Sequence, residues 1–284
     1  MSVRDPNEQR AESAERWNRA ATGWGRMADQ VRAFGMPVSA WMIEHVELQP
    51  GQRVLELAAG PGDTGFMAAE VIQPGGTLVS SDHSGEMVAV ARDRARAQGI
   101  ENVEFAELSL EWIDLPTATV DTILCRWGIM LVPDPESAVR EARRVLRPGG
   151  RIAVAVWDEA RLNPWVTIPD RAMIELGHSE RPDPNGPGMF ALAPAPRLQD
   201  LLESAGFVDV EVEGIALERP SPDLESLVAY TRQLSPPFDT AVGALDGAQL
   251  EQLMGKIAEL AAPFAQPDGA FLFPGRSLGA AASA

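Results

Sequence analysis

Short apolar runs alternate with longer amphipathic stretches through the middle of the chain. Residues 53–59 (RVLELAA) form a mostly apolar run of strand length, and residues 64–72 (TGFMAAEVI) follow with helical character. Strands that alternate with helices favour right-handed βαβ units and a parallel sheet, so the pattern predicts an α/β fold. The expected strands are residues 53–59, 76–82, 102–108, 120–127, 151–157 and 207–215, and the expected helices between them are residues 64–72, 85–99, 135–146 and 197–206.

The segment before the first strand is predicted to be helical. Residues 8–34 carry aromatic and small side chains at the spacing of one helix face, and residues 38–48 resemble a second helix. The sequence QPGQ at residues 49–52 then ends the helical pattern. The residues that share the first face are Trp17, Ala20, Ala21 and Trp24.

The pattern weakens after Trp157. Residues 158–195 contain many prolines and glycines together with apolar anchors, which predicts an ordered excursion with a short helix at residues 168–176. Residues 223–264 are helical in character and interrupted by SPPFD at residues 235–239. The tail, GRSLGAAASA, has weak strand propensity.

Composition and charge exclude several classes of partner. The 284 residues carry a formal net charge of −17, which disfavours nucleic acid and anionic membrane surfaces. A single cysteine, Cys125, cannot form a disulfide within the chain, and the polar N-terminus lacks the features of a signal peptide. No apolar run reaches membrane-spanning length. We therefore expect a cytoplasmic protein that binds a small molecule, with a homodimer as the assembly considered.

The stretch GPGDTG at residues 60–65 matches the dinucleotide-binding fingerprint G-x-G-x-x-G. It follows an expected strand and opens an expected helix, with Asp63 or Thr64 as the helix cap. Asp82 lies about twenty residues further on, where an acid that binds ribose is expected. A carboxylate at Glu56, just before the turn, would repel a pyrophosphate, so the residues favour a different nucleoside over NAD.

Three segments in order carry a resemblance to a known family. They are VLELAAGPGDTG at residues 54–65, SSDHSGEM at residues 80–87, and the long segment at residues 120–150 that runs from VDTILCRW to RPGG. With these segments, residues 50–157 resemble class I S-adenosylmethionine (SAM)-dependent methyltransferases of the small-molecule, ubiquinone/menaquinone-biosynthesis-like type. The cofactor that the resemblance implies is S-adenosylmethionine.

The resemblance implies a Rossmann-like seven-stranded sheet in the order 3-2-1-4-5-7-6, with the last strand antiparallel. Residues 275–283 are assigned to that last strand in spite of their poor strand propensity. A helical N-terminal segment and cap insertions would complete the fold. The implied parts are an N-terminal helical cap segment (1–48), a SAM-binding core (49–157), a substrate-side insertion (158–195) and the remainder of the core (196–284), which carries a helical insertion at 221–275.

The resemblance also implies which residues contact the methionine and ribose parts of SAM. Glu56 and the small residues Ala58, Gly60 and Gly62 would face the methionine part, where the backbone must approach the ligand closely. Asp82 would accept hydrogen bonds from the ribose hydroxyls. The family commonly has glycine where Ala58 stands, so alanine fits there if its backbone torsion is not left-handed.

Around the adenine, His83 and Met87 would flank the ring. Ser109 and Leu110 stand where the family usually has an acidic residue that binds the adenine amino group, and Glu107 or Glu111 could substitute for it. An aromatic residue of the N-terminal helix, Trp24, would lie over the amino-acid end of the cofactor, with packing as the alternative. Arg126 or Trp127, at the end of the fourth strand, is expected to line the site.

Catalysis of methyl transfer requires alignment, and a base only where the nucleophile is a hydroxyl or a carbon acid. His178 is the base candidate because the excursion that contains it leaves the ligand side of the sheet. A solvated lid histidine is the alternative. No metal-ligand spacing is present, so no metal is expected.

The leading function is a SAM-dependent methyltransferase that acts on a small organic molecule by O-, N- or C-methylation, in natural-product or quinone tailoring. The alternatives are a non-methylating enzyme on the same fold, such as a cyclase, and a non-enzymatic binding protein. An NAD oxidoreductase is the weakest reading. An apolar, partly aromatic cap formed by residues 158–195 and 221–275 suits an uncharged organic substrate.

Overall fold

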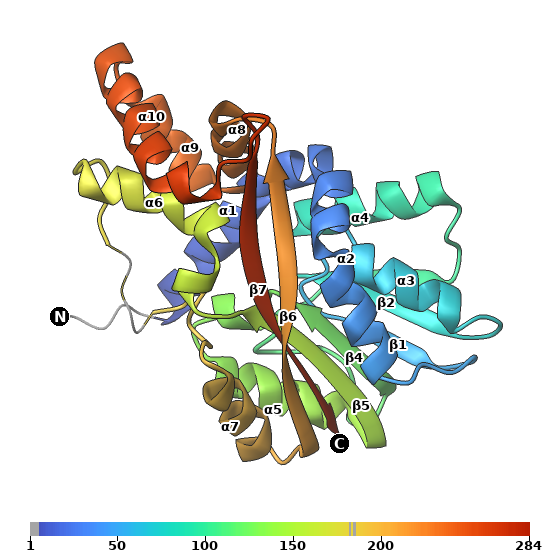
Figure 1. Cartoon of the computed structure of the whole chain (residues 1–284). Helices are drawn as coiled ribbons and strands as arrows, with labels where there is room; N and C mark the ends of the chain where they lie inside the picture. The colour runs from blue at the N-terminus through green and yellow to red at the C-terminus, as the bar shows by residue number, and fades with distance from the viewer. Residues whose placement is uncertain (1–5, 182, 184–185) are drawn as a thin grey trace.

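The computed structural model describes residues 6–181, 183 and 186–284, and its central feature is a seven-stranded sheet (Figure 1). The strand order is β3-β2-β1-β4-β5-β7-β6. The first five strands in this order pair in parallel, whereas β7 is antiparallel to both β5 and β6. The predicted fold class and strand order are therefore confirmed. The strands are β1 (Arg53–Glu56), β2 (Thr77–Asp82), β3 (Val103–Glu107), β4 (Val120–Arg126), β5 (Leu146–Trp157), β6 (Val208–Ser221) and β7 (Phe271–Ser283).

Helices cover both faces of the sheet. The chain crosses from β1 to β2 in one direction along the sheet and from β4 to β5 in the opposite direction, so right-handed crossovers place their two helices on opposite faces. These helices are α3 (Asp63–Val71) and α5 (Pro135–Val145). Helix α2 (Ala28–His45) packs beside α3, and α7 (Ala195–Ser204) packs beside α5, while α4 (Gly85–Gln98) connects β2 to β3.

The last strand forms at the expected place although its sequence is poor in strand formers. It begins earlier than expected, at Phe271, and pairs with neighbours on both sides. A Cβ at Gly279 would come within 2.6 Å of the Trp41 ring, so this part of the strand needs small residues beneath the helix that covers it. Tertiary packing therefore outweighs the local propensity.

The two N-terminal helices divide at a different residue from the one expected. Helix α1 spans Pro6–Arg26 and α2 begins at Ala28, instead of one helix over 8–34 and another from 38. Proline 37 lies inside α2. The break follows from packing: Trp24 is held by the carbonyl of Leu234, whereas the following helix buries its apolar face in the main core, so the chain turns between these two surfaces.

Helices α6 (Pro164–Glu175), α8 (Leu224–Leu234), α9 (Pro236–Gly243) and α10 (Gly247–Ala261) form a cap around one end of the β6–β7 hairpin (Figure 1). Helix α6 starts earlier than the expected residue 168, and the SPPFD stretch both interrupts the helical segment and starts α9. Residues 1–5 of the expected N-terminal part and residues 182, 184 and 185 of the expected insertion lie outside the described residues. The domain boundaries stay a prediction. Among the described residues, no helix combines the length and apolar character needed to cross a membrane.

Candidate functional site

The loop between β1 and α3 is a tight glycine turn that ends in a helix. Gly62, with φ 90°, is the N-cap residue of α3, so the expectation that Asp63 or Thr64 caps this helix is wrong. A Cβ at Gly62 would come within 2.5 Å of the Phe66 ring, and one at Gly65 within 2.2 Å of the Glu56 carboxylate. Gly62 and Gly65 are therefore needed for close packing around the turn, whereas at Gly60 the requirement is the positive φ of 52°.

Glu56, at the end of β1, is buried against the first turn of α3. Its Oε1 accepts a hydrogen bond from the Gly65 N–H (2.7 Å) and its Oε2 accepts one from the Ser80 hydroxyl (3.3 Å). Burial raises the pKa of the Glu56 carboxyl to about 7, although the Gly65 N–H and the charge of Arg126 favour ionisation. This carboxyl can therefore exchange a proton near neutral pH.

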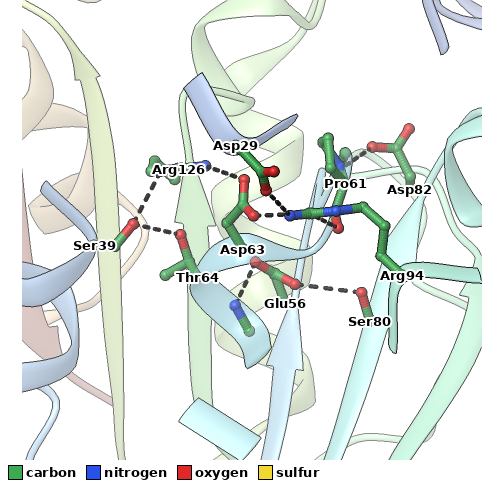
Figure 2. Close-up of polar contacts among 12 residues, drawn as sticks. Asp29, Ser39, Glu56, Pro61, Asp63, Thr64, Ser80, Asp82, Arg94 and Arg126 are labelled. Atoms are coloured by element: carbon green, nitrogen blue, oxygen red, sulfur yellow. Dashed lines mark hydrogen bonds and ion pairs between the residues drawn. The ribbon is translucent and has the colours of Figure 1, made fainter. Parts of the chain in front are cut away.

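Asp63 links the loop to two arginines, as Figure 2 shows. Its Oδ1 accepts a hydrogen bond from Arg94 Nη1 (2.7 Å), and its Oδ2 lies 3.6 Å from Arg126 Nη2. Arg126 also donates to the Ser39 hydroxyl (3.0 Å). Burial lowers the pKa of the Arg126 guanidinium, and the ion pair with Asp63 opposes this effect. The network fixes Arg126 at the end of β4.

Asp82, at the end of β2, holds the glycine loop from the other side. Its Oδ2 accepts from the Gly60 N–H and its Oδ1 from the Ser84 N–H, both at 3.0 Å. A carboxylate has about four acceptor positions, so both oxygens keep acceptor capacity for a ligand. His83 lies beside it, with Nδ1 3.4 Å from Asp82 Oδ1.

Glu56, Asp82, His83 and Arg126 line a cavity of about 300 Å³, here called the first cavity. All of the expected cofactor residues except Gly62 line it. They are Trp24, Glu56, Ala58, Gly60, Asp82, His83, Met87, Ser109, Leu110 and Arg126. Gly62 instead shapes the turn behind it. Glu111 also lines the first cavity, whereas Glu107 is not among the lining residues.

Besides the expected Trp24, helix α1 covers the first cavity with residues that the sequence did not indicate. Arg10 donates two hydrogen bonds to the Glu111 carboxylate (3.0 and 2.9 Å), which also accepts from the Asp134 N–H. The Glu111 carboxylate therefore holds α1 against the segment that follows β3. The α1 residues that line the cavity could have been found from sequence, because they follow the helical spacing that leads to Trp24. The lining residues of α1 are Arg10, Ser13, Ala14, Trp17 and Trp24.

A second cavity of about 310 Å³ adjoins the first. The two share lining residues, among them Trp24 and Trp127, so these indoles stand on the common wall. Both expected cap segments contribute to the second cavity. Residues 158–195 supply Trp165, Val166, Pro187, Gly188 and Met189, and residues 221–275 supply Tyr230, Thr231, Leu234, Ser235, Pro236 and Pro237.

Two residues on the rim of the first cavity have left-handed backbone torsions that favour glycine. Ala58 has φ 50° and Trp127 has φ 59°. The condition under which alanine would fit without strain at position 58 is therefore not met. The Trp127 indole is held by a hydrogen bond from its Nε1 to the Ser277 hydroxyl (3.0 Å) and by stacking on Trp157. Such strain persists where the surroundings fix the conformation, and it often marks a functional site.

His178 lies just after α6 and lines neither cavity. Its backbone N–H donates to the carbonyl of Met173 (2.8 Å), and its side chain is half-buried. The thiol of Cys125 is unreactive at neutral pH, because burial raises its pKa to about 12. Of the candidate residues from the sequence, those with charged or polar side chains that line a cavity therefore lie around the first cavity.

Comparisons with known proteins agree with this geometry. Residues 48–178 match a family model described as a methyltransferase domain. The ubiquinone/menaquinone biosynthesis C-methyltransferase UbiE of Pseudomonas fluorescens is 34% identical over 154 residues, a segment that covers 52% of this chain and 59% of that protein. The match thus spans less than two thirds of the relative.

Solved structures share the fold over most of the chain. The YcgJ protein of Bacillus subtilis has a TM-score of 0.56 at 20% identity, covering 86% of this chain and 97% of that one. The [4+2]-cyclase SpnF has a TM-score of 0.51 at 21% identity, covering 86% of this chain and 80% of that one. At such low identity these likenesses show the fold alone.

Proposed function

Because residues 48–178 belong to the class I SAM-dependent methyltransferase family, we propose that this chain transfers the methyl group of S-adenosylmethionine to a small organic molecule. The observation that carries the proposal is the pair of adjoining cavities with Trp24 and Trp127 on their common wall. A methyl donor in the first cavity and an acceptor in the second would meet at this wall.

The groups around the first cavity fit the parts of SAM. Glu56 and Arg126 offer opposite charges at one end, which suits a zwitterionic amino-acid group. Asp82 keeps acceptor capacity for ribose hydroxyls beside the Gly60 backbone. Met87 and Leu110 offer apolar contact for the adenine, with the polarizable thioether suited to a ring face.

When bound, SAM supplies a sulfonium methyl group as the electrophile. The task of the chain is then to align an acceptor with that methyl group and to exclude water. Alignment of this kind corresponds to effective molarities of roughly 10⁵–10⁸ M. Trp127, fixed by stacking and by its hydrogen bond to Ser277, is placed to set the position of both reactants.

Among the described residues that line the second cavity, none is an aspartate, glutamate or histidine. The base role of His178 stays a prediction, and its position outside both cavities favours a reaction that proceeds by alignment and desolvation. We also propose a cytoplasmic protein, from its single cysteine, and one that does not bind nucleic acid, from its acidic charge. A homodimer is the assembly that we propose.

Thermal melting with SAM, S-adenosylhomocysteine and NADH tests the proposal. A ligand at one hundred times its dissociation constant adds about 2.7 kcal/mol to the free energy of unfolding. We expect both SAM and S-adenosylhomocysteine to raise the melting temperature, and NADH to leave it unchanged. Stabilisation by NADH alone would overturn the assignment of the first cavity. Labelled methyl transfer to an organic acceptor would then establish the reaction.

A further inference from the structure

The second cavity is walled by aromatic rings from several elements that are distant in sequence. Phe34 of α2, Trp127 after β4, Trp157 of β5 and Trp165 of α6 form one cluster, in which Trp127 and Trp157 stack with centroids 4.2 Å apart. Trp17 and Trp24 line the cavity from α1. Such a surface suits the faces of a planar ring system, because aromatic pairs gain energy from stacked and edge-on contacts.

The charged side chains that line or back this cavity are arginines, although the chain as a whole is strongly acidic and Glu12 lies near Arg16 on the same helix. Arg16 is the charged residue among the described lining residues. Behind the wall, the Arg219 guanidinium of β6 lies 3.6 Å from the centroid of the Tyr230 ring and 5.8 Å from that of Phe34. No carboxylate among the described residues forms an ion pair with Arg219, and its buried Nε has no hydrogen-bond partner.

Tyr230 faces this cavity with an unused hydroxyl. The residue is 4% exposed, and its hydroxyl makes no hydrogen bond within the part of the chain that the structure describes. The hydroxyl is not among the fully buried polar atoms without a partner, so it reaches accessible space, and the cavity that Tyr230 lines supplies that space. A hydroxyl with no protein partner beside a mostly apolar cavity is available to a polar group of a ligand. The neighbouring hydroxyl of Thr231 differs, because it already donates to the carbonyl of Leu227 (3.0 Å).

We propose that the second cavity binds a planar aromatic compound carrying an acidic oxygen, a phenol or a carboxylic acid, and that the Tyr230 hydroxyl donates a hydrogen bond to this oxygen. Burial raises the pKa of Tyr230, which keeps the hydroxyl protonated and able to donate. Arg219 acts through Tyr230 as a positioning residue: its charge strengthens the donor and favours a partial or full negative charge on the ligand. That this compound is the methyl acceptor rests on the proposed function.

The same charges disfavour a cationic amine, the other common ligand of aromatic cavities. A cation can bind to the face of an aromatic ring, but Arg219 already occupies one face of Tyr230. A second cation on the opposite face would stand close to the guanidinium and be repelled. Arg126 lies over the Trp127 ring in the same way, 4.9 Å from its centroid.

Four naphthalene probes that differ only in one substituent test the proposal by calorimetry on the full chain saturated with S-adenosylhomocysteine. They are 2-naphthoate, 2-naphthol, 2-methylnaphthalene and 2-naphthylmethylamine. We expect at least one of the two oxygen probes to bind about tenfold or more tightly than the amine, the factor that one charge-assisted hydrogen bond supplies. Comparison of naphthoate with naphthol decides between a carboxylic acid and a phenol. An amine that binds as tightly as both oxygen probes would overturn the proposal.

Variants locate the contact. Tyr230→Phe should weaken the preferred oxygen probe about tenfold and leave 2-methylnaphthalene unchanged, because only the hydroxyl is removed. Thr231→Val is the matched control: it removes a hydroxyl that is already paired and should leave the ratio of the probes unchanged. Arg219→Met should reduce the preference for the oxygen probe, and Arg219→Lys should retain part of it. Equal losses for all probes in Tyr230→Phe would mean that the residue only shapes the cavity.

The test separates this inference from the proposed function. Binding of S-adenosylhomocysteine is titrated first in each protein without a probe. If S-adenosylhomocysteine fails to bind while the oxygen probes still bind through Tyr230, the cofactor assignment is wrong and the inference about the ligand of the second cavity holds. If it binds and the probes show no preference for an acidic oxygen, the proposed function stands and this inference fails.

Discussion

The side chain of Ala58 occupies the space that a side chain at Gly128 would need. A Cβ at Gly128 would stand 2.4 Å from the Ala58 Cβ, far inside van der Waals contact. Ala58 also adopts a left-handed torsion, with φ 50°, at a position where the methyltransferase family that the sequence resembles commonly has glycine. The β1–α3 loop and the end of β4 are therefore matched to each other at the rim of the first cavity.

From this match we predict non-additive effects on stability. Gly128→Ala should cost about 1–3 kcal/mol, the range for overpacking a tight contact. Ala58→Gly should relieve about 1–2 kcal/mol of torsional strain, partly offset by the greater freedom of glycine in the unfolded chain. In the Ala58→Gly background, Gly128→Ala should cost less stability than it does in the original protein, because the Ala58 methyl group that it would clash with is absent. Urea unfolding of the four proteins measures the coupling.

Gly255→Ala provides the control for this cycle. Gly255 lies inside α10, and a Cβ there would meet nothing within 4 Å. Alanine should therefore stabilise the protein by roughly 0.5–1 kcal/mol through helix propensity alone. Strictly additive effects at positions 58 and 128 would contradict the contact.

The buried carboxyl of Glu56 should make stability fall as the pH rises. Below pH 4.5 the carboxyl is protonated in the folded and unfolded states alike. Between pH 4.5 and about 7 the unfolded chain ionises while the native state keeps its proton, so the native state loses up to about 3 kcal/mol relative to the unfolded chain. Glu56→Gln removes this titration while keeping an oxygen for the Gly65 N–H. The difference in unfolding free energy between the two proteins should therefore shift by that amount across this range, and a constant difference would contradict the raised pKa.

The same carboxyl should make cofactor binding depend on pH in the opposite direction. If Glu56 binds the ammonium group of the cofactor, it must be ionised in the complex, so binding releases a proton at pH values below about 7. The affinity for S-adenosylhomocysteine should then fall about tenfold for each pH unit below 7. Calorimetry in buffers with different ionisation enthalpies measures the released proton. Glu56→Gln should bind more weakly at pH 7.5 and show no such dependence.

Most of the fold could be predicted because the strands are distinct in the apolar pattern. The order of the strands came from the family resemblance, and residues 275–283 were assigned to the last strand in spite of their weak propensity. Packing against Trp41 explains why small residues occur there. The break at Met27 could not be predicted, because it depends on where Trp24 is anchored by a segment some two hundred residues later.

The sequence indicated the residues of the first cavity that depend on backbone turns and strand ends, and it missed those that depend on long-range packing. That these residues bind the cofactor stays a prediction. Asp82 and Gly60 follow from their positions after two parallel strands. The Arg10–Glu111 pair joins α1 to the segment after β3 and leaves no local signal in sequence. The left-handed torsion of Ala58 could not be predicted from the sequence either, since alanine seldom adopts such a torsion.

Asp82 should contribute to both stability and cofactor affinity. Asp82→Ala leaves the N–H groups of Gly60 and Ser84 without their acceptor, so we expect a loss of about 1–3 kcal/mol of stability, together with at least tenfold weaker binding of SAM. Asp82→Asn keeps one carbonyl oxygen, so its loss in the free energy of unfolding should be smaller than its loss in the free energy of SAM binding. Asp93→Asn, at an exposed position of α4, is the control. Unchanged affinity in Asp82→Ala by calorimetry would place the ribose elsewhere.

The position of His178 leads to a prediction that separates two mechanisms. If His178 were the general base, His178→Ala would lower turnover by roughly 10²–10⁴-fold and leave SAM affinity unchanged. Because His178 lines neither cavity, we expect less than a twofold change, measured as labelled methyl transfer to an acceptor such as 2-naphthol. Tyr230→Phe in the same assay should raise the KM for that acceptor. A large loss in His178→Ala would mean that the His178 imidazole reaches the acceptor during turnover. A small loss leaves alignment between Trp24 and Trp127, with water excluded, as the source of the rate.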